Sequence, residues 1–256
     1  MRSNGCMSDD FRRELARIAS LAIQSLVPFS CACGEKGLHM CDACASEFSG
    51  GISWVEDVCE GVCEARPVSD GRELEIVPAF RVATLAEYEG RAKSVILDFK
   101  NGGHFALASY LGPLLADALI DLSAGCSHRH MLVPVPSRSE AVRRRGEDHM
   151  RLLAESVSTH ARVRLAPALA LVGASQHSRT KRERAGATRR MIRPKRNAQW
   201  EGLRGAQAVI LDDVVTTGST LKKTSEALKL LGVHTCAALT LASARLPRTN
   251  IPILAV

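Results

Sequence analysis

The chain has 256 residues, 46% of them hydrophobic, so it can form one large domain or one medium domain with a small module. Its formal net charge of +7 favours anionic partners, either phosphorylated metabolites or nucleic acid. No apolar run reaches the thickness of a bilayer, and the first residues lack the apolar core of a secretion signal. We therefore expect no membrane span and a cytoplasmic location.

The first predicted element is a helix over residues 9–26, where apolar residues recur at helical spacing. Ser8 is suited to cap its start, and Pro28 ends it. We therefore expect residues 1–27 to form an N-terminal helical segment.

Residues 28–75 are expected to form a cysteine-rich module that ends in a linker over residues 66–75. The chain has nine cysteines and no secretion signal, which argues against a disulfide framework. Two closely spaced pairs flank a short loop, and four thiolates from two such knuckles suit a tetrahedral structural Zn²⁺ site formed by Cys31, Cys33, Cys41 and Cys44. The first pair is the tighter C-x-C, so buried metal-free cysteines or redox thiols are the alternatives. Cys59 and Cys63 could replace a weak ligand or form half of a second site.

From about residue 76 the pattern alternates between strands and helices. Strands are expected at residues 77–85, 131–136, 163–171, 206–211 and 233–242, and helices at residues 87–99, 104–122, 146–161 and 219–231. This alternation predicts an α/β domain over residues 76–256, with a mostly parallel sheet flanked by helices on both faces. In such a sheet, ligands bind at the carboxyl ends of the strands.

The expected strand at residues 131–136 ends in a turn that two prolines make rigid. Ser137 and Arg138 follow it, and three more arginines stand at residues 143–145. Guanidinium groups bind phosphate oxygens in bidentate fashion. If this strand is a neighbour of the strand ending near residue 211, its loop faces the same ligand. The alternative is a solvated basic loop.

Residues 179–196 contain nine basic residues and one acidic residue. One interpretation is a lid whose arginines bind an anionic ligand and exclude water. A second is a nucleic-acid contact, and a third is a solvated basic loop. Trp200 is the only aromatic residue nearby, which disfavours a stacking platform for bases.

The most informative segment is residues 209–220, where an apolar run leads into Asp212 and Asp213, then a hydroxyl-rich turn and a helical pattern. The N–H groups at such a helix start attract a phosphate, and hydroxyls add further bonds; the turn residues are Thr216, Thr217, Gly218, Ser219 and Thr220. The two carboxylates accept hydrogen bonds, so they suit the hydroxyls of a ribose beside that phosphate. An ordinary capped strand–helix turn is the alternative.

This segment resembles the phosphoribosyl pyrophosphate (PRPP) signature of the type I phosphoribosyltransferases. Over most of the chain, the order of motifs resembles the ComF family of competence-associated, phosphoribosyltransferase-like proteins. The motifs are the cysteine knuckle from residue 28, Tyr88-Glu89-Gly90, Phe99-Lys100-Asn101-Gly102, V-P-V-P at residues 133–136 and R-R-G at residues 144–146. The chain departs from the family at residues 147–149, which read Glu-Asp-His instead of Phe-Asn-Gln, and at Arg179 and Ala187.

The resemblance implies a type I phosphoribosyltransferase-like fold with an N-terminal zinc module. It also implies that PRPP binds with Mg²⁺, Asp212 and Asp213 holding the ribose 2′- and 3′-hydroxyls and the turn at residues 216–220 holding the 5′-phosphate. Ser137, Arg138 and Arg184 are then expected at the pyrophosphate, and residues 179–196 lie where such enzymes carry a mobile flap. Apart from the resemblance, His149 and His177 could carry a proton, but we interpret each as a surface histidine.

Two classes of function follow from this resemblance. The first is an enzyme of nucleotide or related metabolism that transfers phosphoribose to an unknown acceptor and releases pyrophosphate. The second is a non-catalytic PRPP-binding or DNA-uptake accessory protein, with nucleic acid or a competence-machinery protein as partner. A regulator that binds nucleic acid through residues 179–196 is a weaker third interpretation.

Overall fold

The computed structural model describes residues 30–36, 39–55, 62–67, 74–123, 130–172, 191–195 and 203–244. The helix expected at residues 9–26 lies outside the described residues. So do Cys59, His177, Arg184 and most of the basic segment at residues 179–196.

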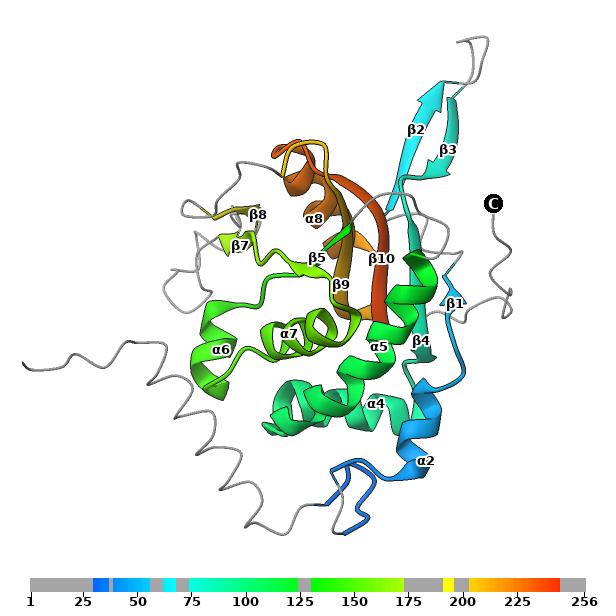
Figure 1. Cartoon of the computed structure of the whole chain (residues 1–256), viewed down its shortest axis with the longest axis vertical. Coiled ribbons are helices and arrows are strands. Elements are labelled where there is room, and N and C mark those ends of the chain that lie inside the picture. The colour runs from blue at the N-terminus through cyan, green and yellow to red at the C-terminus, as the bar shows by residue number, and fades with distance from the viewer. Residues whose placement is uncertain are drawn as a thin grey trace, which may run out of the picture.

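A six-stranded sheet forms the centre of the molecule, in the order β1-β4-β10-β9-β5-β6 (Figure 1). All neighbours pair in parallel except β1, which runs antiparallel to β4 at the edge. The prediction of a mostly parallel α/β sheet is confirmed. The strands are β1 (Ser53–Trp54), β4 (Arg81–Glu87), β5 (His130–Pro134), β6 (Arg164–Leu165), β9 (Gln207–Val215) and β10 (His234–Ser243).

Helices cover both faces of this sheet, because its central strands are apolar on both sides. Within β9, Val209 and Leu211 pack into the core beneath α4, α5 and α7, whereas Ala208 and Ile210 pack on the other face, beneath α8. This alternation is the period of two that a strand imposes on its side chains. The helices are α4 (Gly90–Leu97), α5 (Ala108–Ser123), α7 (His149–Ala161) and α8 (Ser219–Lys229).

One apolar helix corrects an expectation drawn from the sequence. Residues Phe105–Leu122 are long and apolar enough, by length and composition, to cross a membrane, so the expectation that no run reaches this length is wrong. In this fold Leu111, Leu115 and Leu119 are buried in the core beneath the helix. The stretch is apolar because α5 packs on the central sheet.

Several boundaries differ from those expected. The strand expected at residues 77–85 is broken at Ala79 and Phe80, and its first part, β3 (Leu74–Pro78), pairs with β2 (Cys63–Pro67) in a hairpin that projects from the domain. The expected linker at residues 66–75 overlaps this hairpin. A short helix, α6 (Ser139–Arg145), and a second antiparallel pair also form, the pair joining β7 (Leu169–Val172) to β8 (Met191–Pro194).

The cysteine-rich segment packs directly on the sheet domain. It contains α2 (Asp42–Ala45) and a 3-10 turn, Ser46–Phe48. Phe48 and Trp54 belong to the same buried cluster as Val95 and Ile96 of α4. The module therefore extends the core of the larger domain.

Candidate functional site

A pocket of about 500 Å³ opens at the carboxyl ends of β5 and β9. These strands are parallel neighbours, paired up to Pro134 and Leu211, so the loops that follow them adjoin. The two strands are thus neighbours, which is the condition under which the loop at residues 137–138 was expected to face the same ligand as the segment after residue 211. The pocket's polar lining is Lys100, Asn101, Ser137, Arg138, Arg144, Arg145, His149, Asp212, Asp213, Thr220 and Lys223.

The two aspartates stand inside a strand and not beyond its end. The strand was expected to stop at residue 211, but β9 continues to Val215. Asp212 is 9% exposed and Asp213 is 5% exposed, yet both line the pocket. Each carboxylate accepts the next backbone N–H, from Asp213 N to Asp212 Oδ1 at 2.9 Å and from Val214 N to Asp213 Oδ1 at 2.7 Å. Their geometry is therefore fixed by the backbone.

Asp213 is held by two further groups. Lys100 Nζ lies 2.5 Å from Asp213 Oδ2, and His149 Nε2 lies 3.1 Å from the same oxygen. Burial raises the pKa of Asp213, but hydrogen bonding by His149 and the charge of Lys100 outweigh it and lower that pKa to about 2. His149 is 4% exposed, so its interpretation as a surface histidine is wrong.

Asp212 behaves in the opposite way. Burial, followed by the negative charge of Asp213, raises the pKa of Asp212 to about 8. Near neutral pH the pair therefore carries one proton, on Asp212, and one negative charge, on Asp213. A protonated Asp212 can donate as well as accept a hydrogen bond, which an ionised carboxylate cannot do.

The turn after β9 begins α8. Gly218 has φ +72°, a left-handed conformation in which glycine is favoured, and it precedes the first helical residue. Thr216 and Thr217 are exposed, and the hydroxyl of Thr217 accepts the N–H of Ser219 at 3.4 Å. Of the five turn residues, Thr220 lines the pocket, and the other four lie next to it along the chain.

The loop after β5 supplies the opposite wall. Ser137 Oγ donates to Asp148 Oδ1 at 2.5 Å, and Asp148 also caps α7 by accepting two backbone N–H groups. Arg145 Nη1 donates to the Lys100 carbonyl at 2.5 Å, which joins α6 to the segment carrying Lys100. Arg138 also lines the pocket, on an exposed part of the loop.

The charge of the lining favours an anionic ligand. Among the described residues that line the pocket, five cationic side chains accompany two aspartates, one of which is protonated near neutral pH; the cations are Lys100, Arg138, Arg144, Arg145 and Lys223. Sequence reasoning did not assign Lys100 or Lys223 to the site, and it named His149 only as a possible proton carrier, with a surface histidine as the favoured interpretation. Lys223 stands one helical turn after Ser219, a spacing that would have identified it.

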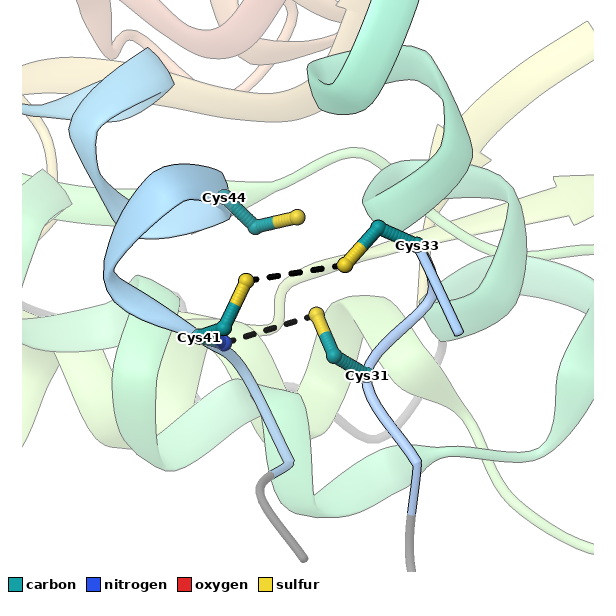
Figure 2. Close-up of side chains that lie close together, drawn as sticks. All are labelled: Cys31, Cys33, Cys41 and Cys44. Atoms are coloured by element: carbon teal, nitrogen blue, oxygen red, sulfur yellow. Dashed lines mark hydrogen bonds between the residues drawn. The ribbon is translucent and has the colours of Figure 1, made fainter. Parts of the chain in front are cut away.

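The four cysteines of the two knuckles converge (Figure 2). Their sulfur atoms all lie within 4.8 Å of one another, two from the turn at residues 31–33 and two from the start of α2; the residues are Cys31, Cys33, Cys41 and Cys44. The Cys33 and Cys41 sulfurs are 3.5 Å apart. A tetrahedron with Zn–S bonds of about 2.3 Å has edges of about 3.8 Å, so the sulfur set fits a metal ion of that size.

Backbone geometry supports this cluster. Cys41 N donates to Cys31 Sγ at 3.4 Å. Burial opposes ionisation of Cys31, but hydrogen bonds from the Cys33 and Cys41 backbone lower the pKa of its thiol to about 7, toward the thiolate that a metal requires. Cys63 is buried at the start of β2, outside this group of four.

No family model matches the sequence, and no curated protein matches it. Similar solved structures include an adenine phosphoribosyltransferase, 13% identical, with 78% of this chain and 89% of that chain covered and a TM-score of 0.38. The adenine phosphoribosyltransferase of Saccharomyces cerevisiae is 12% identical (79% and 89% covered, TM-score 0.35). A hypoxanthine phosphoribosyltransferase of Staphylococcus aureus is 15% identical (56% and 64% covered, TM-score 0.30). These similarities are weak, so function is inferred from the pocket itself.

Proposed function

We propose that the chain is a PRPP-binding, phosphoribosyltransferase-like protein of the ComF type, which transfers phosphoribose to an acceptor and releases pyrophosphate in the cytoplasm. One observation carries this proposal. The acidic pair, the hydroxyl-rich start of α8 and the arginine-bearing loop after β5 adjoin one pocket at the carboxyl ends of two parallel neighbours. A sugar with a diol and two phosphate-bearing ends could use all three, with the carboxyl groups at the diol and the two loops at the phosphates.

The acidic pair is assigned to the ribose. Asp213 has acceptor capacity for about four hydrogen bonds, and Lys100, His149 and the Val214 N–H use three of them, so it contributes at most one to a ligand. Asp212, protonated near neutral pH, can donate to one hydroxyl oxygen and accept from another. We therefore assign the larger part of diol binding to Asp212.

The phosphate groups are assigned to the two loops. The start of α8, with the turn at residues 216–220, binds the 5′-phosphate through backbone N–H groups and hydroxyls. Arg138 and Arg144, which both line the pocket, neutralise the pyrophosphate as it leaves. Arg184, outside the described residues, is assigned to the same group. The Ser137 hydroxyl is already bonded to Asp148, so its proposed role is to hold the loop in place.

Mg²⁺ is expected to arrive with PRPP. One or two carboxylates beside substrate phosphates are the usual ligands of this ion. Of the pair, Asp213 is the ionised member, and it has about one acceptor position left for the ion or for the ribose. When bound, Mg²⁺ offsets charge on the leaving pyrophosphate. The cysteine cluster is assigned to Zn²⁺ in a structural role, since four thiolates leave no open coordination position.

The test is calorimetric titration with PRPP and Mg²⁺. The wild type should bind, and the double variant Asp212→Asn/Asp213→Asn should lose at least roughly 100-fold in affinity. The variant removes the one negative charge of the pair, on Asp213, and with it the partner that holds Lys100 and His149 beside the ligand. Asp117→Asn, an exposed change on α5, is the matched control and should bind as the wild type does. Pyrophosphate release on adding nucleobases or other nitrogen nucleophiles then separates turnover from binding alone. Salt-sensitive DNA binding without PRPP binding would refute the proposal and leave the nucleic-acid regulator.

A further inference from the structure

A chain of hydrogen bonds runs from the cysteine knuckle to the segment that carries Lys100. His39, which lies between the two cysteine pairs, approaches His104 with 2.7 Å between His39 Nδ1 and His104 Nε2. The other ring nitrogen of His104, Nδ1, lies 2.8 Å from Asp98 Oδ2. Asp98 is the first residue of a π-helical turn, Asp98–Gly102, and Lys100 stands in its middle.

The direction of these bonds follows from the chemistry of the groups. A carboxylate only accepts, so His104 Nδ1 must carry the hydrogen that binds Asp98. A neutral His104 then accepts at Nε2, and His39 Nδ1 donates to it. The His104 side chain is only 11% exposed, so water competes poorly for these contacts.

The π-helical turn needs such support. π-helical turns are rare in proteins, and many of those that occur lie at functional sites. Such a turn shifts one residue out of the α-helical register. Three contacts hold this one: Phe99 is buried in the core, Arg145 donates to the Lys100 carbonyl, and the Asp98 carboxylate folds over Gly102. A Cβ at residue 102 would collide with that carboxylate, so the observed position of the Asp98 side chain depends on glycine at residue 102.

We propose that His104 is a positioning residue: through Asp98 it sets the turn that presents Lys100 to Asp213, and through His39 it ties this turn to the cysteine knuckle. The inference rests on the proposed function for its ligand, PRPP. Lys100 lies 2.5 Å from Asp213 at the floor of the pocket, so a shift of the turn changes the charge that the ligand meets. The knuckle thereby supports the ligand site.

A double-mutant cycle tests the route through Lys100. PRPP affinity in the presence of Mg²⁺ is measured by calorimetry for the wild type, Lys100→Ala, His104→Ala and the double variant. We expect His104→Ala to weaken binding about tenfold, as is typical of coupled sites. When His104→Ala is added to Lys100→Ala, PRPP affinity should fall by less than about twofold, because the side chain through which His104 acts is already absent. Equal losses in both backgrounds, or no loss in His104→Ala alone, would overturn the inference.

Two conservative variants separate the links. His104→Asn keeps a donor near the position of Nδ1, so it should keep the Asp98 contact and most of the affinity while losing the His39 contact. His104→Gln reaches toward His39 and should bind as weakly as His104→Ala. The matched control is His160→Ala, an exposed histidine on α7, which should leave affinity unchanged.

Hydrogen exchange tests the same chain without any ligand. In full-length, zinc-loaded protein, His39→Ala and His104→Ala should each speed exchange of the amides at residues 98–102 by about tenfold, because the turn opens more easily. His160→Ala should not. If the wild type binds no PRPP, the proposed function fails, and these exchange rates still decide whether the chain holds the turn. Unchanged rates in both variants would refute it.

Discussion

At the scale of single residues, the adjacent aspartates of β9 have opposite ionisation behaviour for identifiable reasons. Asp213 faces Lys100 and His149, which stabilise its charge. Asp212 is equally buried, and its strongest charged neighbour is Asp213, which disfavours a second negative charge. Two like charges this close cannot both ionise without cost. The pair therefore has distinct donor and acceptor members before any ligand binds.

These pKa shifts predict opposite effects of replacing each aspartate. The pKa of Asp212 is raised, so its contribution to stability is complete below about pH 4 and is lost as pH rises through about 8. The pKa of Asp213 is lowered to about 2, so its contribution is present above about pH 4 and is lost as pH falls through about 2. Asp212→Asn should therefore gain stability relative to the wild type as pH rises from 5 to 8.5.

Asp213→Asn should instead destabilise the protein at pH 7 by about 1–3 kcal/mol, because two donors lose their charged partner. Lys100 is 38% exposed and can turn to solvent, which keeps the loss at the lower end of buried pairs. Denaturant unfolding at pH 5, 7 and 8.5 measures both effects. Asp117→Asn should show neither, and a pH-independent Asp212→Asn difference would contradict the assigned pKa.

At the scale of elements, the sequence was sufficient where periodicity was strong. The apolar run at residues 206–211 predicted a buried strand, and the pattern from Ser219 predicted α8. The sequence did not predict that Asp212 and Asp213 lie within β9. They do so because β10 pairs with β9 as far as Val215, which extends the strand past the apolar run. Sequence reasoning also missed the break before α7, where Asp148 caps a new helix.

The turn before α8 offers a prediction at this scale. Gly218 has φ +72°, so Gly218→Ala forces a left-handed alanine and should cost roughly 1–2 kcal/mol of stability. It should also weaken PRPP binding by at least about tenfold, because backbone N–H groups there have to meet a phosphate closely.

Gly205→Ala is the matched control for this change. Gly205 has a similar φ of +78°, and a Cβ added there would meet no atom within 4 Å. It precedes β9 at the other end of the strand. Thermal unfolding should therefore show similar losses for both variants, while calorimetry should show weakened binding for Gly218→Ala alone. If Gly218→Ala and Gly205→Ala bound PRPP with equal affinity, the turn before α8 would not contact the ligand.

At the scale of the whole molecule, the site combines elements that sequence patterns do not connect. Lys100 reaches Asp213 through a π-helical turn, and His149 reaches it because α7 packs on the sheet. Both contacts depend on tertiary packing, so neither could be read from spacing. The loops after β5 and β9 could be predicted to meet, because parallel neighbours end at the same edge.

The cysteine knuckle shares its core with the domain that carries the pocket. Loss of the metal should therefore lower the stability of the whole domain. Cys41, Cys44 and Phe48 are buried in one cluster with Val95 and Phe99. Removing the metal leaves four thiols that no longer hold the two knuckles together, and the packing over α4 loosens. We expect a strong chelator to lower the thermal midpoint by roughly 5–10 °C.

Two variants make this prediction specific. Cys44→Ser should lower the midpoint without chelator and respond little to it, because one of four ligands is gone. Cys236→Ser, a change on β10 outside the cluster, should respond to chelator as the wild type does. Zinc content, measured on the same samples, links each midpoint to occupancy. If the thermal midpoint of fully zinc-depleted wild type were unchanged, packing alone would hold the knuckle. The four cysteines would then not form a stabilising metal site.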